Sequence, residues 1–80
     1  MPELPIVSGQ QVISALKEIG YEIVSQKGSH VKLRKFYRED KHIIVVPLHK
    51  ELDRGTLMSI IRRVRVYFPQ NEFLKILKEK

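Results

Sequence analysis

The sequence predicts an α+β fold, in which one helix precedes a three-stranded antiparallel sheet and further helices follow it. Three observations predict this order: a helical apolar spacing near the N-terminus, alternating side chains from residue 21 to residue 46, and two helical stripes after residue 53. The apolar sides of these elements must meet, because 80 residues build one small core. We expect one domain over residues 1–80, with the helices on one face of the sheet.

The first helix is predicted from about residue 9 to residue 19. Pro2 and Pro5 keep the preceding residues extended, and Ser8 is a candidate N-cap. Gly20 supplies the stop signal after the last apolar residue. The apolar residues that recur at helical spacing are Val12, Ile13, Leu16 and Ile19.

Three strands are predicted from alternation and from the turn signals between them. Gly28-Ser29 turns the chain once, the charged group Arg38–Lys41 turns it again, and Pro47 ends the last strand. The connections are short, which favours an antiparallel meander. The predicted strands are Tyr21–Lys27, His30–Tyr37 and His42–Val46.

Two helices are predicted in the C-terminal third, after a polar loop over Leu48–Arg54. Asp53 is a candidate N-cap for a helix over roughly residues 56–66. Pro69 breaks the pattern, and Asn71 is the candidate cap of a short terminal helix. The apolar stripes of the two helices are Leu57, Ile60, Ile61 and Val64, and Phe73, Leu74, Ile76 and Leu77.

The composition narrows the class of function. Fifteen Lys and Arg against nine Asp and Glu give a net charge of +6, which favours nucleic acid, a membrane surface or an acidic partner. No apolar run approaches the roughly 20 residues of a membrane span, and residues 1–8 lack the features of a signal peptide, so we expect a cytoplasmic protein. The chain has no cysteine, and its histidines at 30, 42 and 49 lack a metal-ligand spacing. We expect neither a metal nor a small-molecule cofactor.

The candidate site begins with the histidine that follows the Gly28-Ser29 turn. Alternation places His30, Lys32 and Arg34 on the solvated side of their strand, and Lys27 and Lys35 flank them in the sequence. An imidazole beside fixed cations suits a phosphodiester substrate, because it exchanges protons near neutral pH while the cations hold the anion. The alternative is a solvated histidine without a chemical role.

An ordered set of short motifs resembles the HicA toxin family, also called YcfA-like, over nearly the whole chain. The sequence departs from the family pattern at Val64–Gln70, which is basic and aromatic where the family has a shorter linker. The matching motifs are Leu4-Pro5, Val12 to Gly20, Lys27-Gly28-Ser29-His30, Val46-Pro47-Leu48-His49, Gly55-Thr56-Leu57, Ser59-Ile60-Ile61 and Glu72-Phe73-Leu74-Lys75.

The resemblance implies a double-stranded-RNA-binding-domain-like fold and a small mRNA interferase that a HicB antitoxin neutralises. The catalytic histidine of the family falls on His30. The 2′-hydroxyl of RNA is the nucleophile, so the protein needs a proton-exchanging group and cations but no metal. His49 is a possible auxiliary residue. The candidate RNA-binding residues are Lys27, Ser29, Lys32, Arg34, Arg62 and Arg63.

Two other classes remain open. A non-catalytic RNA-binding module would use the same fold and charge to recognise the shape and the 2′-hydroxyls of double-stranded RNA. A protein-interaction domain would need an exposed apolar patch, and the unassigned apolar side chains lie mainly near Tyr67 and Phe68. The cluster of Arg62, Arg63 and Arg65 is either a phosphate-binding or a merely solvated helix face and not part of the chemistry.

Overall fold

The computed structural model describes residues 4–80, so the expectation for Pro2 lies outside the described residues. Helices and strands follow one another in the predicted order, with bounds close to those expected. The elements are α1 (Gly9–Glu18), β1 (Glu22–Lys27), β2 (His30–Tyr37), β3 (Asp40–Pro47), α2 (Arg54–Val64) and α3 (Gln70–Lys78).

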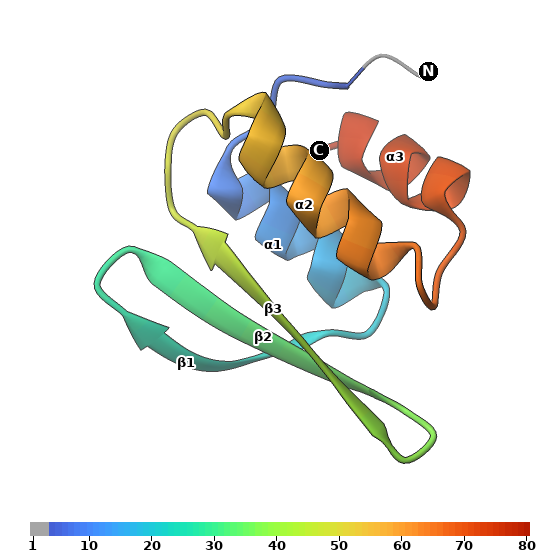
Figure 1. Ribbon diagram of the computed structural model, residues 1–80. Coiled ribbons are helices and arrows are strands. Elements are labelled where there is room, and N and C mark those ends of the chain that lie inside the picture. The colour runs from blue at the N-terminus through green and yellow to red at the C-terminus, as the bar shows by residue number, and fades with distance from the viewer. Residues whose placement is uncertain (1–3) are drawn as a thin grey trace.

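The three strands form one antiparallel sheet in the order β1-β2-β3. Figure 1 shows the helices gathered on one side of this sheet, while the tip of the β2–β3 hairpin extends past them. The predicted α+β class and the one-sided helix layer are therefore confirmed, and the arrangement is consistent with a double-stranded-RNA-binding-domain-like fold. No helix within residues 4–80 has both the length and the apolar character needed to cross a membrane.

Side-chain caps begin the first two helices, as predicted. Ser8 and Gln11 form a reciprocal capping box at α1, in which each side chain accepts a hydrogen bond from the other residue's backbone N–H. Asp53 caps α2 and accepts hydrogen bonds from both the backbone N–H and the hydroxyl of Thr56. The prediction for Asn71 is wrong, because α3 already begins at Gln70 and its N-cap position is Pro69.

The turns set the strand boundaries. Gly28 has a φ of +59° in the β1–β2 turn, a conformation that glycine adopts without a steric penalty. Arg38 and Glu39 form the β2–β3 turn, so β3 begins at Asp40 and not at His42 as expected. The prediction that Arg38–Lys41 forms the turn is therefore wrong for its second half, because Asp40 and Lys41 pair with β2.

The core lies between the inner face of the sheet and the helices. Alternate residues of β2 and β3 enter it, which gives the strands one buried and one solvated side. α3 packs on α1 and α2, and Lys80 of the C-terminus forms an ion pair with Glu18 of α1. The most deeply buried side chains are Phe73, Leu16, Leu33, Ile44, Leu57, Ile61, Leu77, Val12, Val46 and Val64.

The start of α1 packs directly on the end of β3. The backbone N–H of Gly9 donates to the carbonyl of His49 at 2.9 Å, and that of Leu48 donates to the carbonyl of Ser29 at 2.6 Å. A Cβ atom on Gly9 would lie 2.0 Å from the carbonyl oxygen of Pro47, so this joint has room for glycine alone. The joint links α1 to the turn that precedes His30.

Candidate active site

The sheet face opposite the helices carries the predicted site. His30 and Lys32 are exposed and Arg34 is half-buried, while the intervening Val31 and Leu33 are buried in the core. The expectation that this side of β2 stays uncovered by a helix is confirmed. We define the open face as the outward residues of β2 and their partners in the ladder: His30, Lys32, Arg34 and Phe36 of β2, Lys27, Ser25 and Glu22 of β1, and Pro47, Val45, Ile43 and Lys41 of β3.

The ladder places a second cation beside the histidine. Lys27 is the partner of His30 across the β1–β2 turn, and Lys32 lies two residues further along the same side of β2. All three side chains are exposed, and within residues 4–80 neither lysine forms an ion pair. An anion at His30 would therefore meet positive charge from two adjacent strands.

Arg34 differs from these lysines because it is already engaged. Its guanidinium donates to the carboxylate of Glu22 at 2.6 Å and lies 5.1 Å from the ring centroid of Phe36. Part of its charge is thus compensated within the protein. The sequence prediction omitted Phe36, although alternation places it on the same side as His30.

Lys35 belongs to the other side of the sheet. Its ammonium donates to the carbonyl of Ile19 at the end of α1 and lies 4.7 Å from the ring centroid of Tyr37. A cation at a helix C-terminus complements the unpaired carbonyls there. Lys35 flanks His30 in the sequence, but it stabilises α1 and is absent from the open face.

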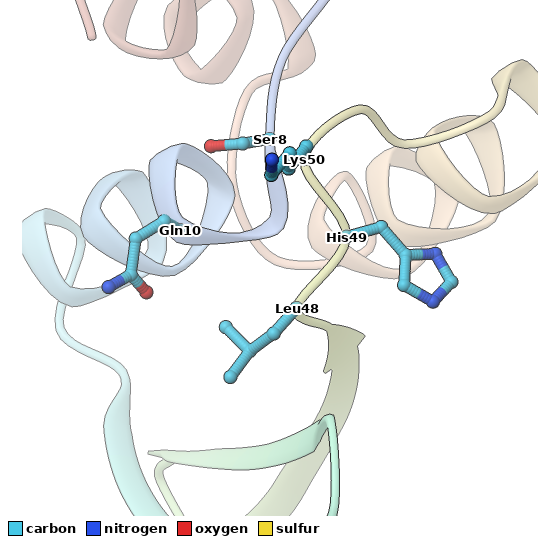
Figure 2. A pocket seen from close by; sticks show the side chains of 5 residues that line it. All are labelled: Ser8, Gln10, Leu48, His49 and Lys50. Carbon is cyan, nitrogen blue, oxygen red and sulfur yellow. The ribbon is translucent and has the colours of Figure 1, made fainter.

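Ser29 and His49 lie near the turn end of the open face. Ser29 accepts the backbone hydrogen bond of Leu48, so the segment that carries His49 runs beside the Gly28-Ser29 turn. His49 is exposed and lines a shallow surface hollow with Ser8, Gln10, Leu48 and Lys50. In Figure 2 its imidazole points away from Gln10 and Ser8.

Arg62 and Arg63 lie on α2, in the helix layer, and so do not share a face with His30. The guanidinium of Arg63 donates to the carbonyl of Ile43 through Nε at 3.1 Å and Nη2 at 2.8 Å. These bonds tie α2 to the outer edge of β3. Arg62 is exposed.

A buried histidine that the sequence did not single out lies on the inner face of β3. The Nδ1 atom of His42 is 2.6 Å from the hydroxyl of Tyr21, and the aromatic rings of Tyr37 and Tyr67 surround the imidazole. Burial, and secondarily the Arg63 guanidinium, lower the pKa of His42. The alternation with Ile44 predicts the burial of His42, whereas its tyrosine neighbours come from β2 and from the segments before β1 and after α2.

The protein is therefore expected to lose stability as the pH falls below the ordinary histidine pKa of 6.5. Below this pH, His42 binds a proton in the unfolded chain but stays neutral in the folded protein. The contribution of neutral His42 to the free energy of unfolding is therefore fully present above pH 6.5. It decreases by at most about 1.4 kcal/mol per pH unit as the pH falls toward the lower pKa of the folded state. Thermal midpoints between about pH 7.5 and about pH 5.5 test this.

The control for the pH series is His42→Gln, which keeps a polar partner for Tyr21 but cannot take up a proton. Its thermal midpoint is expected to vary less over the same pH interval. Parallel pH profiles for the parent and this variant would contradict the assignment to His42.

The open face can hold a phosphodiester between cations next to an exposed imidazole. Among residues 4–80, no group of three His, Cys, Asp or Glu residues is placed to hold a metal ion. Histidine can exchange a proton with a reacting hydroxyl near neutral pH, and ammonium groups stabilise charge that develops on a phosphate.

Comparison with known proteins gives one match. A family model described as "HicA toxin of bacterial toxin-antitoxin" matches residues 9–66, from the start of α1 to just beyond α2. No curated protein and no solved structure matches the chain. The match includes the open face and excludes α3.

Proposed function

The chain belongs to the HicA toxin family, the toxins of bacterial toxin–antitoxin systems, and from this premise we propose that it is an mRNA-cleaving endoribonuclease with His30 as its general acid–base. The observation that carries the proposal is the exposed His30 on a face shared with Lys27 and Lys32. The reaction would take place in the cytoplasm, on mRNA.

The chemistry needs one proton transfer and stabilisation of charge. His30 takes the proton of a 2′-hydroxyl while the 2′-oxygen attacks the adjacent phosphorus. The bond from phosphorus to the 5′-oxygen then breaks, and the leaving oxygen takes up a proton from solvent. The products are a 2′,3′-cyclic phosphate and a 5′-hydroxyl.

The cations have separate roles in this scheme. Lys27 and Lys32 stabilise the charge that develops on the phosphate, because they are exposed beside His30. Ser29 offers its hydroxyl to the same phosphate. Arg62 and Arg63 would contact phosphates of a longer RNA that passes around the β3 edge. His49 is the candidate auxiliary group at the turn end of the open face.

A single 2′-deoxy substitution in an RNA oligonucleotide tests the proposed nucleophile. Placed directly before the cleaved phosphate, it is expected to abolish cleavage at that phosphate, because no 2′-oxygen is present to attack. A 2′-deoxy residue one position away serves as the control and leaves the cut intact. Chelator present throughout should not change the rate. Cleavage next to the 2′-deoxy residue would exclude this mechanism and favour an attacking water.

We also propose that an acidic antitoxin of the HicB type covers the open face. The net charge of +6 favours an acidic partner, and a protein seated on His30 would exclude RNA directly. Ile43 and Val45 of the open face, half-buried and exposed respectively, would supply apolar contact beside the cations.

Charge reversal at Lys32 is expected to slow antitoxin association, because steering depends on charge near the interface. Lys32→Glu should lower the association rate several-fold at low salt, and Lys75→Glu, the same change on an exposed position of α3, much less. Association kinetics by surface plasmon resonance measure both. A larger effect at Lys75 would place the partner on the helix layer and overturn this geometry.

A further inference from the structure

One aromatic side chain on the open face is exposed without an evident structural reason. Phe36 is 54% exposed although its neighbours on the open face, Arg34 and Lys41, are charged. It is the last outward residue of β2 before Tyr37, close to the end of the hairpin that extends past the helices (Figure 1). A phenyl ring in this setting offers a flat apolar surface that the fold does not use.

The ring is held in place by its neighbours. The Arg34 guanidinium lies 5.1 Å from its centroid, and the 2.6 Å bond to Glu22 fixes that guanidinium in turn. Glu22, Arg34 and Phe36 therefore form a row in which each side chain orders the next. An ordered aromatic surface loses little conformational freedom when a ligand stacks on it.

The ring is in line with the proposed catalytic residue. His30 and Phe36 are on the same side of one strand and six residues apart, which corresponds to about 20 Å along β2. Lys32 lies between them, and Lys41 is the partner of Phe36 across the β2–β3 ladder. A strand of RNA that lies along β2 from His30 would reach the ring after several nucleotides.

We propose that Phe36, held by Arg34, is a binding subsite for one unpaired RNA base several nucleotides from the cleaved phosphate. The proposal rests on RNA being the substrate, as in the proposed function, and adds that the RNA must be single-stranded at this position. Aromatic rings on a basic surface bind unpaired bases by stacking, whereas a base within a duplex is not available.

The charges around the ring favour RNA over a protein as its occupant. Lys41 is exposed across the ladder from Phe36, and Lys32 is exposed four residues before it on the same side of β2, so both can contact phosphates of an RNA whose base stacks on the ring. A protein partner would instead use the ring as part of an apolar contact, together with Val45 and Ile43. The experiments below distinguish RNA from a protein as the partner that binds Phe36.

The first experiment measures affinity for a single-stranded RNA made non-cleavable by 2′-O-methyl groups. Phe36→Leu keeps an apolar side chain but removes the π-face, and is expected to weaken binding about 5- to 100-fold. Phe36→Tyr keeps the ring and should bind like the parent. Stacking releases no counterions, so Phe36→Leu should leave the salt dependence of binding unchanged, whereas Lys32→Ala should make it shallower.

The second experiment uses the absence of tryptophan from the sequence. Phe36→Trp introduces a single indole, whose fluorescence is expected to be quenched by the single-stranded RNA and not by a duplex of the same sequence. Ile6→Trp, at an 80% exposed position before α1 and beside Lys78 of α3, is the control and should respond to neither.

The outcomes distinguish the subsite from the proposed function. Parental RNA affinity for Phe36→Leu, or equal quenching by single strand and duplex, overturns the subsite even when cleavage is observed. Loss of antitoxin binding with unchanged RNA affinity likewise overturns it and assigns the ring to the protein partner. Quenching and weakened binding without any cleavage support the subsite while the proposed catalysis fails. Absence of RNA binding by the parent protein overturns both.

Discussion

Purified His30→Ala protein is expected to lose RNA cleavage by about 10²- to 10⁴-fold, the usual contribution of general acid–base catalysis. A 2′-hydroxyl is a weak nucleophile at neutral pH, and the titratable neighbours of His30 on the open face, Lys27 and Lys32, act in this scheme on the charge of the phosphate and not in proton transfer. Expression of the variant should not arrest bacterial growth. Cleavage assays with chelator, followed over time, measure the effect.

Loss of folding should not account for the loss of activity. His30 is exposed, and substitutions at exposed positions usually change stability by about 0.5 kcal/mol or less. Circular dichroism of the variant checks this. RNA affinity should fall only modestly, because Lys27 and Lys32 remain. If folded His30→Ala protein cleaves RNA close to the parental rate, the catalytic assignment is wrong and a non-catalytic RNA-binding function takes its place.

The RNA cleavage rate of the His49→Ala variant shows whether His49 takes part in the reaction. We expect a smaller loss than for His30→Ala, because His49 follows the end of β3 and is not among the outward residues of the strands. An activity equal to that of the parent would remove His49 from the site.

The Gly9→Ala variant is expected to be less stable by about 1–3 kcal/mol, the usual cost of overpacking. The added Cβ would lie 2.0 Å from the oxygen and 3.0 Å from the carbon of the Pro47 carbonyl, and neither backbone atom can move without displacing β3. For a domain of this size the thermal midpoint should fall by roughly 5–20 °C. Thermal unfolding followed by circular dichroism measures it.

Gly55→Ala is the matched control, because it places the same methyl group near the start of another helix. The nearest atom there is Oδ2 of Asp53 at 3.2 Å. This side-chain carboxylate caps α2, and it needs to move far less than the Pro47 carbonyl does at Gly9. Higher helix propensity should make this variant equally stable or more stable, by up to about 1 kcal/mol. If the thermal midpoints of the two variants change equally, α1 does not pack on β3 as closely as described.

The sidedness of the sheet could be predicted because alternation is a property of the strand itself. The alternation from His30 to Arg34 is enough to predict which side chains face solvent. In the structure His30 and Lys32 are exposed on the side away from the core. The β2–β3 turn was harder to locate. Arg38 adopts a φ of +59°, where glycine or asparagine is usual, so the charged run contains no residue that marks its position.

The roles of individual cations could not be predicted, because their partners are distant in the chain. Lys35 binds the carbonyl of Ile19, 16 residues away, and Arg63 that of Ile43, 20 residues away. The local sequence shows a positive charge in each case, but it does not show which carbonyl accepts the hydrogen bond. The ion pair of Arg34 with Glu22 could not be predicted either, because it depends on the register between β1 and β2.

The hydrogen bonds from Arg63 to Ile43 also protect an edge strand of the sheet from pairing with the sheet of another molecule. An outer strand with free backbone groups is a template for pairing with a second chain. On β3 the Arg63 guanidinium already occupies one of these carbonyls, and on β1 the bulge between Ile23 and Ser25 interrupts the regular spacing. Neither border presents a regular, unoccupied row of backbone groups to an incoming strand, which disfavours edge-to-edge pairing between two copies of the toxin.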